Sequence, residues 1–113
     1  MKLPSSDQVI IAPAKITNYL LCLGHPDGSS KAQFFMKFGF SLDAPVKLIN
    51  ALYDHANSHE VVKIEPTEHG TRYVIEGSLQ AADGRTPNLR SVWFIRNGEE
   101  TPRLVTAYPL DPE

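Results

Sequence analysis

The sequence predicts an α+β fold in which about three N-terminal helices pack on one face of a four-stranded antiparallel β-meander. Apolar residues recur at helical spacing in the first half of the chain and at alternate positions in the second half. Short turn sequences separate the extended segments, and segments joined by short turns pair antiparallel. Helices that precede such a sheet bury their apolar stripes against one of its faces.

Length and composition indicate a single domain over residues 1–113. Of the 113 residues, 42% are hydrophobic and 21% are charged, which is ordinary for a globular protein with one core. Eleven Lys and Arg residues against 13 Asp and Glu give a formal net charge of −2. No general positive field therefore attracts nucleic acid, so RNA binding requires a local basic patch, and no DNA partner is expected.

The expected location is the cytoplasm, although a domain exported as part of a larger carrier would have the same sequence features. The single cysteine, Cys22, lies in an apolar run and has no partner for an intramolecular disulfide, which fits a packed thiol in a reducing compartment. The first seven residues lack an apolar signal core, and the apolar runs are too short to span a membrane. We therefore expect no membrane partner.

The start of the chain predicts a short arm followed by a helix. Residues 4–13 favour an extended arm or edge strand that ends at Pro13. A first helix is expected over residues 15–23, because apolar residues recur there at helical spacing until Gly24 and Pro26 stop the pattern.

A loop of turn-forming residues leads into the second helix, which we expect over residues 31–37. Ser29 or Ser30 is suited to cap this helix by accepting its free amide hydrogens. Lys31 then lies in the first turn, where a cation beside free N–H groups would make a good phosphate seat. A solvated surface lysine is the alternative interpretation.

The third helix has the most regular pattern. We expect Ser41 or Asp43 as its cap and Pro45 in its first turn. Its apolar stripe consists of Leu48, Ile49, Leu52 and Ala56.

After residue 57 the apolar period changes from helical to extended. The last two strands form a hairpin around Asn97-Gly98, a dipeptide that tolerates positive φ. The four expected strands cover residues 61–65, 71–79, 89–96 and 103–108.

Short catalytic motifs are missing from the sequence, which has no P-loop, dinucleotide glycine fingerprint, paired cysteines or His-Glu-x-x-His. His55 and His59 stand four apart and could hold a metal on a continued helix. Asn57-Ser58 is expected to end the helix between them, and a third ligand at obvious spacing is lacking. We expect neither a metal nor a cofactor.

The remaining polar residues fit cleavage of RNA by its own 2′-hydroxyl. This reaction needs a base, an acid and cations that stabilise the extra negative charge on phosphorus. Histidine suits the first two roles because its pKa lies near neutrality, and Lys or Arg suits the third. The available residues are His25, Lys31, His55, His59 and Arg72, with Arg90, Arg96 and Arg103 on the last hairpin and Thr106 and Tyr108 as neutral donors.

Alternation along the last hairpin assigns its side chains to two faces. Either both faces are covered, or one is a partly apolar cleft on which a base could stack. The simpler interpretation is that Trp93 and Tyr108 are core residues, each with a hydrogen-bonded polar tip. One face carries Arg90, Val92, Phe94 and Arg96, the other carries Ser91, Trp93 and Ile95, and on the last strand Thr106 and Tyr108 oppose Val105 and Ala107.

Two segments resemble motifs of known proteins. The first runs from Tyr19-Leu-Leu through residues 25–35 to Phe38-Gly39-Phe40, and the second runs from Gly84-Arg85-Thr86-Pro87 through residues 91–95 to residues 103–109. They resemble the start and the end of an uncharacterised bacterial family, found alone or at the carboxyl ends of polymorphic toxins and phage proteins. This family is grouped with the barnase, EndoU, colicin and RelE ribonuclease superfamily.

The resemblance implies helices followed by a four-stranded antiparallel sheet. It also implies metal-independent endoribonuclease activity, often on tRNA or ribosome-bound mRNA. By motif match it nominates His25, Lys31, Thr106 and Tyr108, whereas His55 and Arg72 enter from chemistry alone.

The leading hypothesis is therefore a ribonuclease-like toxin domain that is opposed by a neutralising antitoxin or immunity protein. It predicts that the nominated residues converge on one concave surface. Their roles would be His25 or His55 as acid or base, Lys31 and Arg72 to hold the scissile phosphate, and Thr106 and Tyr108 to orient it.

Two alternatives keep the fold without the activity. One is a non-enzymatic binding or adaptor module, which the net charge of −2 favours. The other is an antitoxin or immunity-type partner that would form a stable complex with a basic protein. The adaptor interpretation allows the nominated residues to lie on separate faces, and the antitoxin interpretation predicts no toxicity on expression.

Overall fold

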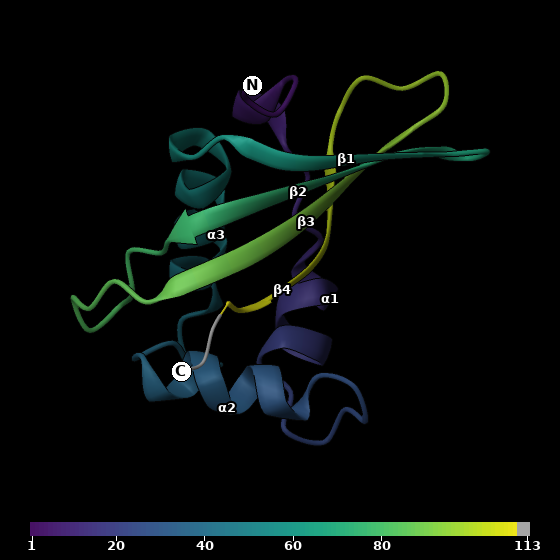
Figure 1. Ribbon diagram of the computed structural model, residues 1–113. Helices are drawn as coiled ribbons and strands as arrows, with labels where there is room; N and C mark the ends of the chain where they lie inside the picture. The colour runs from purple at the N-terminus through teal and green to yellow at the C-terminus, as the bar shows by residue number, and fades with distance from the viewer. Residues whose placement is uncertain (111–113) are drawn as a thin grey trace.

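The computed structural model describes residues 1–110 and has the predicted α+β architecture (Figure 1). The helical segments are η1 (Ser6–Gln8), α1 (Pro13–Lys15), the π-helix η2 (Ile16–Leu20), α2 (Ser29–Lys37) and α3 (Pro45–Ser58). The strands are β1 (Val61–Thr67), β2 (Gly70–Ser78), β3 (Asn88–Arg96) and β4 (Arg103–Pro109).

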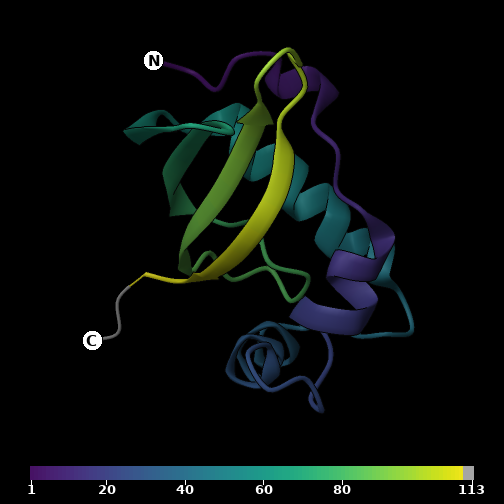
Figure 2. The same ribbon diagram turned by 90° about the vertical axis from the view of Figure 1, so that its right-hand side faces the viewer.

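The four strands form one antiparallel sheet in the order β1-β2-β3-β4, so the predicted meander is confirmed. In Figure 1 α3 lies behind β2 and β3, and Figure 2 shows α2 below the sheet and α1 beside β4. We call the face against α3 the inner face and the opposite face the outer face. The outer face is where the polar side chains of the sheet gather.

The core lies between the inner face and the helices. Trp93 at the middle of β3 is fully buried, and its strand neighbours Leu104 and Tyr73 pack beside it. The stripe of α3 that the sequence predicts contributes Leu48 and Leu52, both fully buried. Burying apolar surface of this kind is the main favourable term in folding.

The hairpin of β3 and β4 turns where the sequence predicts. Gly98 has φ of 83°, a conformation that glycine adopts without steric penalty. Between Val92 and Trp93 the pairing with β4 shifts by one residue, because Val105 is inserted as a bulge. The bulge keeps Thr106 opposite Val92 and Leu104 opposite Trp93, which returns the two strands to matching faces.

The first predicted helix differs from the structure in extent and type. It begins earlier, at Pro13, and changes at Ile16 into a π-helix that ends at Leu20. The amide of Leu21 donates to the carbonyl of Ile16, the five-residue step of a π-helix. Helical apolar spacing could not reveal this local widening.

The predicted caps of the third helix are wrong. Ala44 occupies the position before the first helical residue, Pro45, and no side chain caps the helix. The hydroxyl of Ser41 instead accepts a hydrogen bond from the amide of Asp43, so it stabilises the turn before the helix.

The N-terminal arm closes the free edge of β4. Ile10 pairs in parallel with Arg103, its amide donates to Pro102 O at 2.8 Å, and its carbonyl accepts from Leu104 N at 3.0 Å. This agrees with the predicted edge element, although η1 interrupts the arm. No helix among residues 1–110 is long and apolar enough to cross a membrane.

Candidate functional site

The outer face carries paired polar residues across its strands. Arg72 on β2 lies opposite Phe94 on β3, and Glu76 lies opposite Arg90. Arg90 in turn lies opposite Tyr108 on β4. Because these residues sit at alternate positions of antiparallel neighbours, their side chains share one face.

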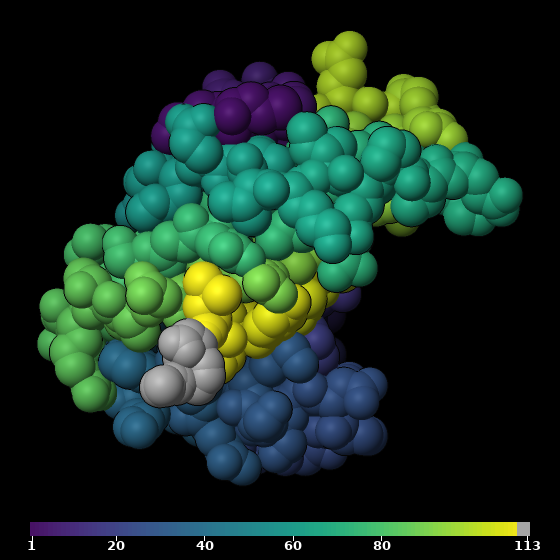
Figure 3. Space-filling view, in the orientation of Figure 1, coloured from purple at the N-terminus to yellow at the C-terminus, as the bar shows by residue number. Residues whose placement is uncertain are grey.

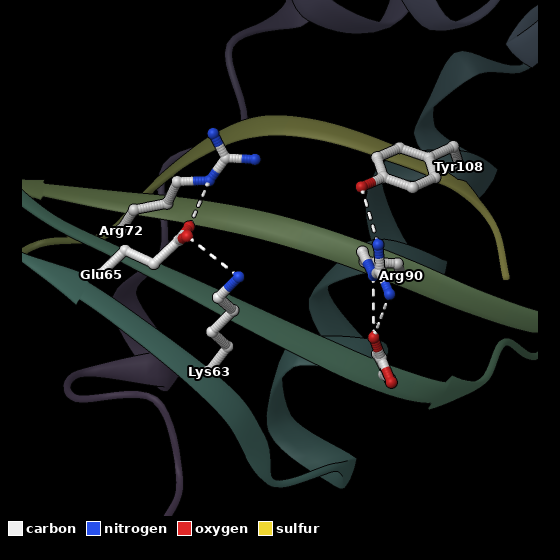
Figure 4. A network of polar contacts seen from close by, with 6 residues as sticks. Lys63, Glu65, Arg72, Arg90 and Tyr108 are labelled. Atoms are coloured by element: carbon white, nitrogen blue, oxygen red, sulfur yellow. Dashed lines mark hydrogen bonds and ion pairs between the residues drawn. The ribbon is translucent and has the colours of Figure 1, made fainter.

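A first hollow, the sheet cleft, lies over β1, β2 and β3 and has a volume of about 460 Å³. Figure 4 shows Glu65 between two cations, with Arg72 Nε at 3.3 Å and Lys63 Nζ at 3.2 Å from its oxygens. The Arg72 Nε is buried and has no hydrogen bond within residues 1–110, since the carboxylate of Glu65 pairs with it by charge alone. Arg72 is therefore held in place by its ion pair with Glu65.

The other end of the sheet cleft is a hydrogen-bonded group around Arg90. Its Nε donates to Glu76 Oε2 at 2.8 Å, and its Nη1 donates to the hydroxyl of Tyr108 at 3.2 Å. The hydrogen bond to Tyr108 raises the pKa of Arg90 most, and the bond to Glu76 raises it further. Because Tyr108 accepts this bond, its own O–H is directed to some other acceptor.

A second hollow, the loop cleft, has a volume of about 650 Å³ and lies between β4 and the segment from α1 to the loop before α2. Its walls are joined by a hydrogen bond, because the hydroxyl of Tyr19 lies 2.9 Å from Thr106 Oγ1. The ring of His25 packs edge-on against Tyr19, with centroids 5.0 Å apart. The lining also includes Lys15 and Arg72.

His25 organises the loop that leads into α2. Its Nδ1 accepts the amide hydrogens of Asp27 at 2.9 Å and Gly28 at 3.0 Å, and its carbonyl accepts from Ser29 at 3.1 Å. Accepting at Nδ1 places the proton of the neutral ring on Nε2. The expected serine caps are therefore wrong, because Gly28 precedes the first helical residue and no side chain caps α2.

Lys31 lies on α2 near one tyrosine of each cleft. Its Nζ lies 5.6 Å from the ring centre of Tyr19 and 5.9 Å from that of Tyr108, and it donates to Asp27 O at 3.1 Å. A lysine above aromatic rings is attracted by their electron-rich faces. Lys31 lies in the first turn of α2, as the sequence predicts.

The structure places five of the six nominated residues in or beside the two neighbouring clefts. Arg72 lines both clefts, and Figure 3 shows β4, in yellow, between the teal β1–β2 hairpin and the blue region of α2. The five residues are His25, Lys31, Arg72, Thr106 and Tyr108.

His55 lies apart from this region, in the core on the inner side of the sheet. It is 2% exposed, and its Nδ1 lies 2.9 Å from Ser91 Oγ while its Nε2 lies 3.1 Å from Gly77 O. Burial, opposed by the bond to Gly77, lowers its pKa to about 4. Its ring cannot reach an RNA phosphate, so we leave it out of the site.

Sequence reasoning missed three neighbours of the nominated residues. Glu65 pairs with Arg72 across the β1–β2 hairpin, and counting outward from the turn at Glu68-His69 would have placed them opposite each other. Tyr19 and Lys15 lacked such a signal, since they reach the cleft only through the docking of α1 and η2 beside β4.

The clefts are cationic although the chain as a whole is acidic. The sheet cleft presents Lys63, Arg72 and Arg90, the loop cleft adds Lys15, and the carboxylates that line the two are Asp27, Glu65 and Glu76. Lys31 adds a further cation at the junction. Among the residues described, no three His, Cys, Asp or Glu side chains are grouped to hold a metal ion.

The fold and the clefts define an α+β protein with a cationic, tyrosine-lined surface on the open face of its sheet. The chain belongs to the family described as a domain of unknown function, DUF6883, whose model matches residues 2–111. A comparison with curated proteins gave no match.

One solved structure has a similar fold along nearly the whole chain. It is described as a contact-dependent growth inhibition toxin and immunity protein complex from Klebsiella pneumoniae 342. The TM-score is 0.70 at 12% sequence identity, and the match covers 95% of this chain and 97% of the other. At this identity the similarity shows a shared fold.

Proposed function

We propose that the protein is a metal-independent endoribonuclease-like toxin domain and that the joined clefts are its active site. The observation that carries this proposal is the position of Arg72, which lines both clefts. A guanidinium presents a fork of donors that suits a phosphate group. The similarity in fold to a chain of a toxin and immunity complex supports the toxin class.

The phosphate of the RNA backbone binds at the junction between Arg72 and Lys31. Lys31 faces the rings of Tyr19 and Tyr108 and is held there by its bond to Asp27 O, and Arg72 lines both clefts. His25 donates from Nε2 to a phosphate oxygen, because its Nδ1 is occupied by two amide hydrogens. This donor role replaces the acid or base role that the sequence suggests.

Proton transfer falls to Tyr108 and solvent. The 2′-oxygen attacks phosphorus as a water molecule takes its proton, and the bond from phosphorus to the 5′-oxygen breaks as Tyr108 gives that oxygen its proton. The products are a 2′,3′-cyclic phosphate and a 5′-hydroxyl, and Tyr108 then regains a proton from solvent. Arg90 stabilises the charge that develops on the Tyr108 oxygen through its hydrogen bond.

Incubation with end-labelled single-stranded RNA in EDTA tests the proposal. We expect cleavage to 2′,3′-cyclic phosphate ends, with Lys31→Ala and His25→Ala strongly reduced. Lys47→Gln, an exposed lysine on α3 away from the clefts, serves as the matched charge control. Intact RNA with folded wild-type protein would reject the enzyme.

A second candidate is an immunity-type or adaptor module that uses the same surface for binding a protein. The description of the similar structure names both a toxin and an immunity protein, and this chain carries a net charge of −2. Expression in bacteria separates the two candidates. The toxin domain inhibits growth when expressed alone, whereas an immunity-type module is harmless and protects cells against a toxin that it binds.

A further inference from the structure

A third hollow lies at the far end of the outer face, next to Phe94. It has a volume of about 330 Å³, and its apolar lining includes Ile10 of the arm and Val105 of the β4 bulge. Three cations also line it, namely Lys15, Arg96 and Arg103. We call it the Phe94 hollow.

Phe94 lies in the hollow close against the backbone of Gly70 on β2, while its direct partner on β2 is Arg72. A Cβ atom added to Gly70 would approach Phe94 Cζ to 2.8 Å, so glycine allows the ring to lie close against the strand. Phe94 is half-buried and is not part of the apolar core on the inner face. Phe94 is therefore an aromatic ring on the outer face that the apolar core does not need.

The arginines of the hollow are weakly paired or exposed. Arg103 Nη2 lies 3.5 Å from Glu99 Oε1 in a long ion pair. Arg96 is exposed at the end of β3. An aromatic surface beside such guanidinium groups suits a nucleobase with its phosphate.

The hollow is continuous with the proposed active site. Ala12, Lys15 and Val105 line both it and the loop cleft, and Phe94 lies opposite Arg72 in the pairing of β2 with β3. A chain bound across Arg72 can therefore extend over Phe94 without leaving the outer face.

We propose that the Phe94 hollow is a second nucleotide subsite, in which an unpaired base of the RNA stacks on Phe94 while its phosphate binds Arg96, Arg103 and Lys15. The substrate is then single-stranded next to the cleaved bond, because a base in a duplex cannot expose its face to the ring. This inference rests on the proposed function for the identity of the ligand as RNA.

Binding of an uncleavable ligand tests the subsite separately from catalysis. A fluorescent single-stranded 2′-O-methyl octanucleotide lacks the attacking hydroxyl, so its affinity is measured without reaction. Phe94→Leu keeps an apolar side chain but removes the stacking surface, and we expect its affinity to fall at least about fivefold. Arg96→Gln should reduce the slope of log affinity against log salt by about 0.7, the contribution of one phosphate contact.

Cleavage of a short substrate provides the second measurement. A dinucleotide that spans only the scissile bond does not fill the subsite, so Phe94→Leu and Arg96→Gln should cleave it at the wild-type rate. Lys47→Gln should match the wild type in both assays. If neither Phe94→Leu nor Arg96→Gln changes octanucleotide affinity, the subsite is rejected even where RNA is cleaved. If both weaken binding in a protein that cleaves no RNA, the subsite stands and the proposed activity fails.

Discussion

The hydroxyl of Tyr19 lies 2.9 Å from Thr106 Oγ1, although the two residues are 87 positions apart in the sequence. This bond joins η2 to β4 across the floor of the loop cleft. Lys31 lies above the same tyrosine and also faces Tyr108, two positions beyond Thr106. The helical and sheet halves of the site are thus connected at this point.

Removing the bond between Tyr19 and Thr106 should loosen that connection. Tyr19→Phe and Thr106→Val each delete one partner at a partly buried position, so each should lower the free energy of unfolding by about 1 kcal/mol. The double variant should be less destabilised than the sum of the two, because the same bond is lost only once. Urea denaturation measures this, and strictly additive effects would contradict a direct bond.

Gly28→Ala should disturb the His25 loop. A Cβ atom at Gly28 would lie 2.3 Å from the carbonyl oxygen of Tyr19, which is backbone and cannot rotate away. We expect a loss of about 1–3 kcal/mol in stability. Gly24→Ala is the matched control, because a Cβ there meets no atom within 4 Å. Equal stability of the two variants would show that Gly28 does not pack as described.

Ser91→Ala should destabilise the protein more than the loss of one small hydroxyl would suggest. Ser91 Oγ accepts from Trp93 Nε1 at 2.8 Å and lies 2.9 Å from His55 Nδ1, and all three side chains are buried. The substitution leaves two buried polar groups without partners, for which we expect a loss of about 2–4 kcal/mol. Thermal and urea unfolding measure it, and a loss below 1 kcal/mol would mean that water replaces the hydroxyl.

The free energy of unfolding should decrease as the pH is lowered, because of His55. Its pKa is about 4 in the folded protein against 6.5 for the ordinary side chain, so between these values the unfolded chain binds the extra proton. The free energy of unfolding therefore decreases as pH drops through this window. Between pH 7.5 and pH 5 the decrease due to His55 should be about 2 kcal/mol.

His55→Gln provides the comparison for this pH dependence. The variant starts less stable, but its free energy of unfolding should change less between pH 7.5 and pH 5. The other three histidines are present in both proteins. Parallel curves for the two proteins would show that His55 does not titrate between its folded and unfolded values.

The order of elements and the meander could be predicted because they depend on local patterns. The helical stripe of α3, the alternation of β3 and the turn at Gly98 each need only neighbouring residues. The caps could not be predicted in the same way. Serines before α2 are good caps in isolation, but His25 accepts the loop amides instead.

The site could be predicted only in part. The chemistry of Lys31, Arg72 and Tyr108 can be read from the sequence. Their position on one face cannot, because it depends on the bulge at Val105 and on the docking of α2. His55 illustrates the reverse error. Its residue type suits catalysis, but its position on the buried stripe of α3 directs it to the core.

The most direct test of the central claim compares two tyrosine variants in the metal-free RNA cleavage assay. Tyr108→Phe removes the proposed proton donor, and Tyr53→Phe removes an exposed hydroxyl on α3 that bonds only to Asp7 O among the described residues. We predict that Tyr108→Phe slows cleavage by about 10²-fold or more, while Tyr53→Phe cleaves at the wild-type rate. Equal rates for folded Tyr108→Phe and wild-type protein would contradict the assignment of the outer-face clefts as the active site.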